Sequence, residues 1–184
     1  MNLPNKLTML RILMIPVFMF FVEMEHIPYH ILWAFIVFVL ASLTDLLDGK
    51  IARKYNLITD FGKFMDPLAD KILVTSALVY FIPLNIAPAW VVILILTREF
   101  LVTSLRLIAS TKGIVIAADK WGKYKTATTM VWICFALLFV HSIVGGNAVL
   151  HTINVVLMGL SLVLTWISGG NYLWKNRDLI KNAK

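Results

Sequence analysis

Charged residues are scarce in this chain of 184 residues: Asp, Glu, Lys and Arg make up 15% of it, whereas 60% is hydrophobic. A soluble domain of this length needs a more polar surface, so the composition excludes an ordinary water-soluble fold and indicates the lipid bilayer. Cysteine is nearly absent as well. The single Cys134 lies in an apolar run, which excludes an internal disulfide and a cysteine-based metal site.

Long uncharged stretches indicate where the chain crosses the membrane. Residues 27–44, 72–97 and 126–174 contain no Asp, Glu, Lys or Arg, and prolines or glycines divide the two longer stretches. A helix of about 20 apolar residues is long enough to cross the hydrocarbon core. We therefore predict an all-α integral membrane protein with six transmembrane helices, over residues 8–27, 29–51, 66–83, 88–110, 121–143 and 148–174.

These spans leave no room for a separate soluble domain. We expect one transmembrane domain over residues 1–184, with a cytoplasmic N-terminal segment (1–10) and a basic cytoplasmic tail (175–184). A signal peptide is an alternative for the first span, because Lys6 and Arg11 precede a short apolar core. No small-residue cleavage site follows Val22, so we prefer an uncleaved helix.

The distribution of basic residues predicts the orientation. The connections near residues 23–30, 83–88 and 143–148 contain no Lys or Arg, whereas the other connections and both ends of the chain are basic. Because positive residues stay on the cytoplasmic side, we predict a multi-pass protein of the cell membrane with both termini in the cytoplasm. The net charge of +7 then reflects topology and contact with membrane lipids, and we expect no nucleic-acid partner.

Four aspartates form the clearest functional pattern. Asp45 and Asp48 are three residues apart at the cytoplasmic end of the second span, and Asp66 and Asp70 are four apart at the start of the third. Such spacings place each pair on one helix face. Four close carboxylates repel one another unless cations neutralise them. Two Mg²⁺ or Mn²⁺ ions, which prefer oxygen ligands, would do so and would suit a phosphate substrate.

A structural alternative is that these aspartates are ordinary acidic helix ends paired with nearby Lys and Arg side chains. We disfavour it because four carboxylates at paired helical spacing, each pair with a glycine nearby, exceed what a helix end needs. Gly49 would let a ligand approach the backbone, and Arg53, one turn later, could contact a diphosphate.

The eight residues Asp45-x2-Asp48-Gly49-x2-Ala52-Arg53-x8-Gly62-x3-Asp66-x3-Asp70 resemble the signature of the CDP-alcohol phosphotransferase family. Residues near the N-terminus and in two later segments also resemble its phosphatidylglycerophosphate synthase branch. They are Asn2 to Thr8 with Arg11, Thr97-Arg98-Glu99, and Trp121-Gly122-Lys123-x-Lys125-Thr126. The resemblance covers the chain from residue 2 to about residue 130.

This resemblance implies a homodimer of six-helix subunits, a site open to the cytoplasm, and CDP-diacylglycerol as donor. It implies that Asp45, Asp48 and Asp66 hold both metals, and that Asp70 binds one and is the catalytic base. The implied CDP-diacylglycerol site contains Asn5, Thr8, Asp45, Gly49, Ala52, Arg53 and Asp66.

The acceptor must be inferred from basic residues. Arg98 lies inside the fourth span, where an unpaired cation is costly. We expect Lys63, Arg98, Arg106 and Lys123 to bind the phosphate of glycerol 3-phosphate. Arg98 could instead pair with a buried carboxylate such as Glu99 on a neighbouring helix, and the other three could extend toward lipid headgroups.

We therefore expect transfer of a phosphatidyl group from CDP-diacylglycerol to sn-glycerol 3-phosphate. Inositol phosphate, serine or phosphatidylglycerol are alternative acceptors. A cation- or proton-coupled transporter is an alternative of another class, because carboxylates and arginines within membranes also mark ion pathways. The clustering of all four aspartates at one face disfavours transport.

Overall fold

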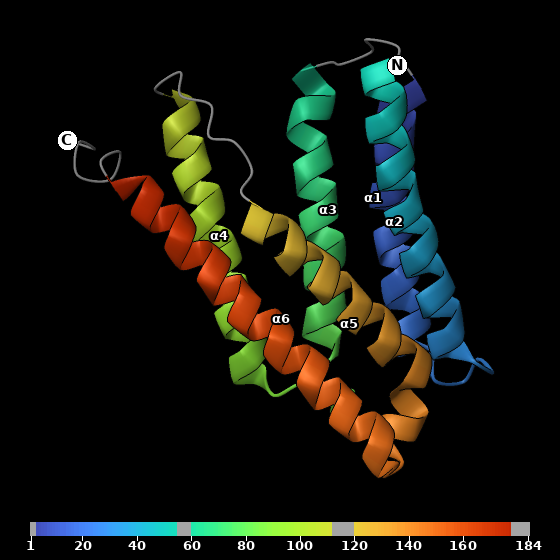
Figure 1. Ribbon diagram of the computed structural model, residues 1–184. Coiled ribbons are helices and arrows are strands. Elements are labelled where there is room, and N and C mark those ends of the chain that lie inside the picture. Colours follow the sequence, from blue (N-terminus) through green and yellow to red (C-terminus); the bar gives the residue numbers. More distant parts are fainter. Residues whose placement is uncertain (1–2, 55–59, 112–119, 178–184) are drawn as a thin grey trace. The chain divides into compact units, whose positions relative to one another are not determined.

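The computed structural model describes residues 3–54, 60–111 and 120–177 (Figure 1). Within them the chain forms six α-helices: α1 (Leu3–Glu23), α2 (His30–Lys54), α3 (Asp60–Tyr80), α4 (Ala89–Thr111), α5 (Lys120–Val144) and α6 (Ala148–Lys175). All six predicted helices are confirmed. The largest differences are early starts: α1 begins at Leu3 rather than residue 8, and α3 at Asp60 rather than residue 66.

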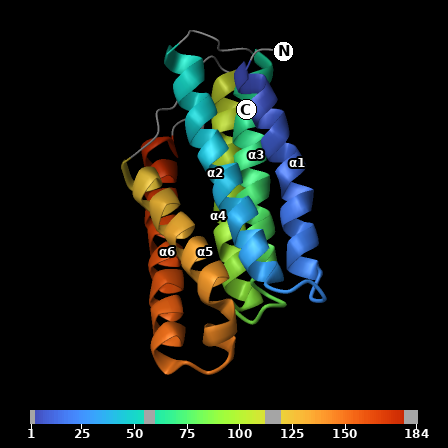
Figure 2. The ribbon, with the colours of Figure 1, turned by 90° about the vertical axis from the view of Figure 1, so that its right-hand side faces the viewer.

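The first of two compact units comprises Met1–Phe81 together with Cys134–Val140. Its helices α1, α2 and α3 run side by side, and α1 contacts both of the others (Figures 1 and 2). Phe18 of α1 is fully buried, and its ring centroid lies 5.9 Å from that of Phe38 on α2 and 6.3 Å from that of Tyr80 on α3. This aromatic contact joins α1 to the two helices that carry the predicted carboxylates.

The second unit comprises Ile82–Ile133 and His141–Lys184. In it α4 packs against α6, and α6 follows α5 after a tight turn (Figure 1). Gly146 in that turn has a φ of +88°, a conformation that favours glycine. The Asn147 side chain then caps α6 by accepting a hydrogen bond of 3.1 Å from the backbone nitrogen of Leu150. The predicted break between the last two helices is therefore confirmed.

Helix α6 is polar inside and apolar outside. Its buried residues are small or polar: Asn154, Ser161, Thr165, Ser168, Gly169 and Tyr172. Its exposed residues include Val155, Val156, Leu160, Val163, Trp166 and Ile167. A helix surrounded by water would have the opposite polarity, whereas small and polar residues are favoured where membrane helices meet. The pattern indicates that lipid surrounds this helix.

Among the described residues, three helices are long and apolar enough to cross a membrane: Asn5–Glu23, Lys120–Val144 and Ala148–Lys175. Helices α3 and α4 carry charged residues within their length, such as Asp66 in α3 and Arg98 and Glu99 in α4. The predicted membrane character is thus supported, and the number of spans and their orientation stay predictions.

Asn154 links three segments of the second unit. Its Oδ1 accepts a hydrogen bond from Trp132 Nε1 of α5, and its Nδ2 donates one to the carbonyl oxygen of Ile86 before α4, each at 2.9 Å. A neighbouring polar contact of 2.7 Å joins Thr129 on α5 to Ser161 on α6. In lipid, where apolar burial adds little to helix association, such bonds help to hold the helices together.

We expect Asn154→Leu to destabilise the protein, because the change removes both hydrogen bonds of the Asn154 side chain. Membrane helix contacts of this kind contribute about 0.6 kcal/mol on average and up to about 1.7 kcal/mol each, so the loss should be about 1–3 kcal/mol. Unfolding of the purified protein in mixed detergent micelles measures it. The control is Thr152→Val, since the Thr152 hydroxyl is exposed and bonds only its own helix. Equal unfolding midpoints for both variants would contradict the role of Asn154.

Candidate active site

Helix α1 contacts one carboxylate from α2 and one from α3. Nη1 of Arg11 lies 2.6 Å from Oδ1 of Asp45, and the Thr8 hydroxyl donates a hydrogen bond of 2.5 Å to Oδ1 of Asp66. Thr8 and Arg11 are three residues apart, so they lie on one face of α1. The two carboxylates therefore approach neighbouring positions on a single turn of α1, at the end of the unit where α2 ends and α3 begins (Figure 1).

The α1 residues that contact the carboxylates are buried, whereas the carboxylates themselves are partly exposed. Arg11 and Thr8 are 0% and 1% exposed, and the Asp45 side chain is 37% exposed. Asp66 and Asp70 are also only partly buried. The carboxylates are thus supported from inside the unit and remain partly accessible from outside it.

These oxygen groups are chemically suited to a divalent cation. Carboxylates are the protein ligands that Mg²⁺ and Mn²⁺ prefer, and Asp45 and Asp66 come together here from two helices. Among the side chains that the structure describes, no three His, Cys, Asp or Glu residues form a group that could hold a metal. The predicted set of four includes Asp48, whose side chain lies outside the described residues, as do those of Ala52, Arg53 and Lys63. Convergence of all four aspartates stays a prediction.

A second ionic cluster lies in the other unit. Oε1 of Glu99 on α4 is 2.6 Å from Nη1 of Arg98 and 2.8 Å from Nζ of Lys125 on α5, and Arg98 Nη2 donates a hydrogen bond of 2.6 Å to the Ser168 hydroxyl of α6. Arg98 and Lys125 are only 7% and 6% exposed. Two buried cations share one carboxylate, so the Arg98–Glu99–Lys125 cluster carries one excess positive charge. An anionic ligand would compensate it.

The predicted alternative for Arg98 is thus partly confirmed: it pairs with Glu99, which lies beside it on the same helix and not on a neighbouring one. The involvement of Lys125 was missed, although the helical period could have revealed it. Lys125 shares a face of α5 with the buried residues Thr129 and Trp132, whereas Lys123 is exposed.

Gly169 makes room for Arg98. A Cβ atom at Gly169 would lie 2.8 Å from Cγ and 3.1 Å from Nε of the arginine, closer than side chains normally pack. The absence of a side chain lets Arg98 lie directly against the α6 backbone, next to its hydrogen-bond partner Ser168.

Arg106, two turns beyond Arg98 on α4, is more exposed. Its Nε donates a hydrogen bond of 3.1 Å to the Tyr172 hydroxyl of α6, and its guanidinium carbon lies 5.3 Å from the centre of the tyrosine ring. Arg98 and Arg106 thus both lie along the contact between α4 and α6.

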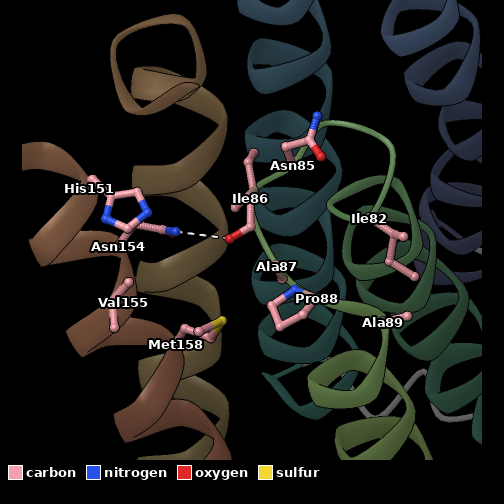
Figure 3. Close-up of a pocket in the computed structure, with 10 residues that line it drawn as sticks. All are labelled: Ile82, Asn85, Ile86, Ala87, Pro88, Ala89, His151, Asn154, Val155 and Met158. Carbon is pink, nitrogen blue, oxygen red and sulfur yellow. Dashed lines mark hydrogen bonds between the residues drawn. The ribbon is translucent and has the colours of Figure 1, made fainter. Parts of the chain in front are cut away.

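A cavity of about 440 Å³ lies elsewhere in the second unit, between the connection that precedes α4 and the first half of α6 (Figure 3). Its lining is mainly apolar, with three polar side chains, Asn85, His151 and Asn154. The connection follows the C-terminal end of α3, whereas Asp66 lies near the N-terminal end of that helix. The cavity therefore does not include the carboxylates.

A model of the family described as CDP-alcohol phosphatidyltransferase matches residues 1–167 of the chain. The chain belongs to this family. The resemblance based on the eight spaced residues is therefore confirmed.

Several relatives match over most of their length. A Bacillus subtilis protein named CDP-diacylglycerol–glycerol-3-phosphate 3-phosphatidyltransferase is 41% identical over 193 residues, covering 99% of this chain and 98% of that protein. A Mycobacterium tuberculosis protein named probable phosphatidylglycerophosphate synthase is 43% identical over 176 residues, covering 94% and 80%. A Rickettsia typhi protein with the same name as the Bacillus relative is 37% identical over 171 residues, covering 93% and 94%.

In this CDP-alcohol phosphatidyltransferase family member, the Arg11–Asp45 ion pair and the Arg98–Glu99–Lys125 cluster both lie within the residues that the family model matches. Ser168 and Gly169, which receive Arg98 on α6, lie just beyond its last matched residue, 167. Only the packing of α4 against α6 shows that these two residues contact Arg98.

We expect Glu99→Gln to lower the thermal stability of the protein, because the change leaves Arg98 and Lys125 buried beside each other without the shared carboxylate. Breaking a buried ionic contact by removing one partner costs about 3–5 kcal/mol. Thermal unfolding in detergent measures the loss, with Glu25→Gln as the control because Glu25 is exposed in the turn between α1 and α2. A Glu99→Gln variant as stable as this control would show that the cluster does not stabilise the fold.

Proposed function

We propose that this protein transfers the phosphatidyl group of CDP-diacylglycerol to sn-glycerol 3-phosphate and releases CMP. The donor follows from family membership, and the acceptor is supported by the names of the Bacillus and Rickettsia relatives. The observation that carries the choice of acceptor is the buried Arg98–Glu99–Lys125 cluster, since its excess positive charge suits a phosphorylated alcohol better than serine.

In the proposed mechanism Asp45, Asp48, Asp66 and Asp70 hold two divalent cations, Mg²⁺ or Mn²⁺. When bound, these ions would neutralise the diphosphate and the negative charge that develops on the leaving oxygen. The donor site would contain Asn5, Thr8, Gly49, Ala52 and Arg53, together with Asp45 and Asp66.

The acceptor hydroxyl attacks the lipid-side phosphorus, so a new phosphorus–oxygen bond forms as the bond to CMP breaks. Asp70 accepts the proton of that hydroxyl. A carboxylate near dications is a weak base, so the contribution of Asp70 is mainly its position within hydrogen-bond reach of the hydroxyl.

The acceptor phosphate would bind to Lys63, Arg98, Arg106 and Lys123, and we add Lys125 to this set. Arg98 and Lys125 supply buried charge. Arg106 on α4 is held by its hydrogen bond to Tyr172, and Lys123 is exposed on α5. Arginine is well suited to the role because its planar group can donate two parallel hydrogen bonds to a phosphate.

We further propose one domain over residues 1–184 that crosses the cell membrane six times and works as a homodimer. Both termini and the active site would face the cytoplasm. The support is the absence of Lys and Arg from the connections near residues 23–30, 83–88 and 143–148.

The test is an acceptor competition with purified protein in detergent micelles, with CMP release as the readout. We expect release that depends on Mg²⁺ or Mn²⁺, stops with EDTA, and is fastest with glycerol 3-phosphate. Inositol phosphate, serine and phosphatidylglycerol are the competing acceptors. Equal turnover with serine, or none with glycerol 3-phosphate, would refute the proposed acceptor, and absence of CMP release with every acceptor would favour a function such as transport.

We expect Gly169→Ala to weaken the use of glycerol 3-phosphate selectively, because the new methyl group would displace Arg98. Loss of a hydrogen bond to a charged group costs about 1.5–3 kcal/mol, so the KM for glycerol 3-phosphate should rise about 10- to 100-fold while the KM for CDP-diacylglycerol changes little. Steady-state kinetics with each substrate varied in turn measures both values.

The matched control is Gly170→Ala, because a Cβ atom at Gly170 has no neighbour within 4 Å. It should behave like the parent protein. If the two alanine variants have the same KM for glycerol 3-phosphate, Arg98 does not contact the acceptor from its observed position.

A further inference from the structure

The contact between Thr8 and Asp66 joins residues 58 positions apart, across the interface between α1 and α3. The hydroxyl is almost completely buried, and it donates to a carboxylate that is partly exposed. Because a buried donor cannot exchange its partner for water, this bond restricts the rotation of the Asp66 side chain. Family resemblance assigns Thr8 to the donor nucleotide and does not include this contact with Asp66.

Arg11 makes the equivalent contact one turn later on α1. Its fully buried guanidinium requires a nearby anion, and Asp45 of α2 provides it at 2.6 Å. Residues three apart on a helix have Cβ atoms about 5–6 Å apart. One turn of α1 therefore contacts both Asp45 and Asp66. Two metal ions bridged by phosphate lie about 3.5–4 Å apart, so the carboxylates that hold them must keep defined positions.

We infer that α1 sets the spacing of the metal-binding carboxylates and that Thr8 is a positioning residue, which orients Asp66 for a divalent cation. This inference rests on the proposed function, because it takes Asp66 to be a metal ligand. Thr8 acts before any lipid binds, so its effect must appear in metal affinity without substrate. Groups that orient metal ligands in this way typically change metal affinity by about 10- to 100-fold.

The test is Mn²⁺ binding to the purified full-length protein in detergent, measured by the electron paramagnetic resonance signal of free Mn²⁺ without CDP-diacylglycerol. Thr8→Val keeps the shape of the side chain and removes the hydroxyl, and we expect it to raise the Mn²⁺ dissociation constant about 10- to 100-fold. Thr8→Ser, which restores the hydroxyl, should bind Mn²⁺ nearly as the parent does. Thr152→Val is the control, because it removes an exposed hydroxyl that bonds only its own helix. If Thr8→Val does not fold, Thr8→Ala removes the same hydroxyl with less bulk.

The outcomes separate this inference from the proposed function. Asp66→Asn should reduce the number of bound Mn²⁺ ions, and unchanged binding by that variant would refute the metal assignment itself. If Asp66→Asn loses Mn²⁺ but Thr8→Val binds it as the parent does, the metal assignment stands and the positioning role of Thr8 is wrong. A Thr8→Val variant with normal Mn²⁺ affinity and a raised KM for CDP-diacylglycerol would show that Thr8 acts only in donor binding and would refute its positioning role.

Discussion

Each unit contains a buried arginine that pairs with a partly exposed carboxylate, and the packing of the helices must accommodate this buried charge. Arg11 and Arg98 lie within helices of an apolar chain and are almost completely shielded from solvent. A cation in that environment is costly unless a carboxylate or an equivalent partner lies beside it. Asp45 and Glu99 meet this requirement at 2.6 Å, and each remains more exposed than its arginine. In the first unit the Arg11–Asp45 pair joins α1 to α2. In the second, Arg98 and Glu99 are neighbours on α4, and the contacts of Glu99 with Lys125 and of Arg98 with Ser168 join α4 to α5 and α6.

The two clusters differ in the ligand that they would attract. Among the described contacts of the first unit, Asp45 lies against a cation, Arg11, whereas Asp66 accepts from an uncharged hydroxyl, so two carboxylates meet one cation there. In the second, two cations share Glu99. The first arrangement suits a cation and the second an anion. The proposed reaction, between a metal-bound diphosphate and a phosphorylated alcohol, would use both kinds of site.

The reversed polarity of α6 explains how such charges can be accommodated in a small membrane protein. Its buried face consists of small and polar residues, which let α4 and α5 approach closely and provide hydrogen-bond partners. Gly169 is the extreme case, because any side chain there would occupy the space of Arg98. The apolar side chains that a soluble protein would bury are directed outward instead, where lipid takes the place of a hydrophobic core.

The sequence alone determined the helices, their turns and the family, because hydrophobic run length, turn residues and the spacing of eight residues are local properties. Family membership and helical spacing also identified Asp45 and Asp66 as candidates, whereas the side chains of Asp48 and Arg53 lie outside the described residues. Only the tertiary structure decided which side chains meet: Thr8 with Asp66, Lys125 rather than Lys123 with Glu99, and Gly169 with Arg98. These contacts depend on how helices distant in sequence rotate and pack. The helical period alone can place Lys125 on a buried face of α5, but it does not show which residue of another helix Lys125 meets.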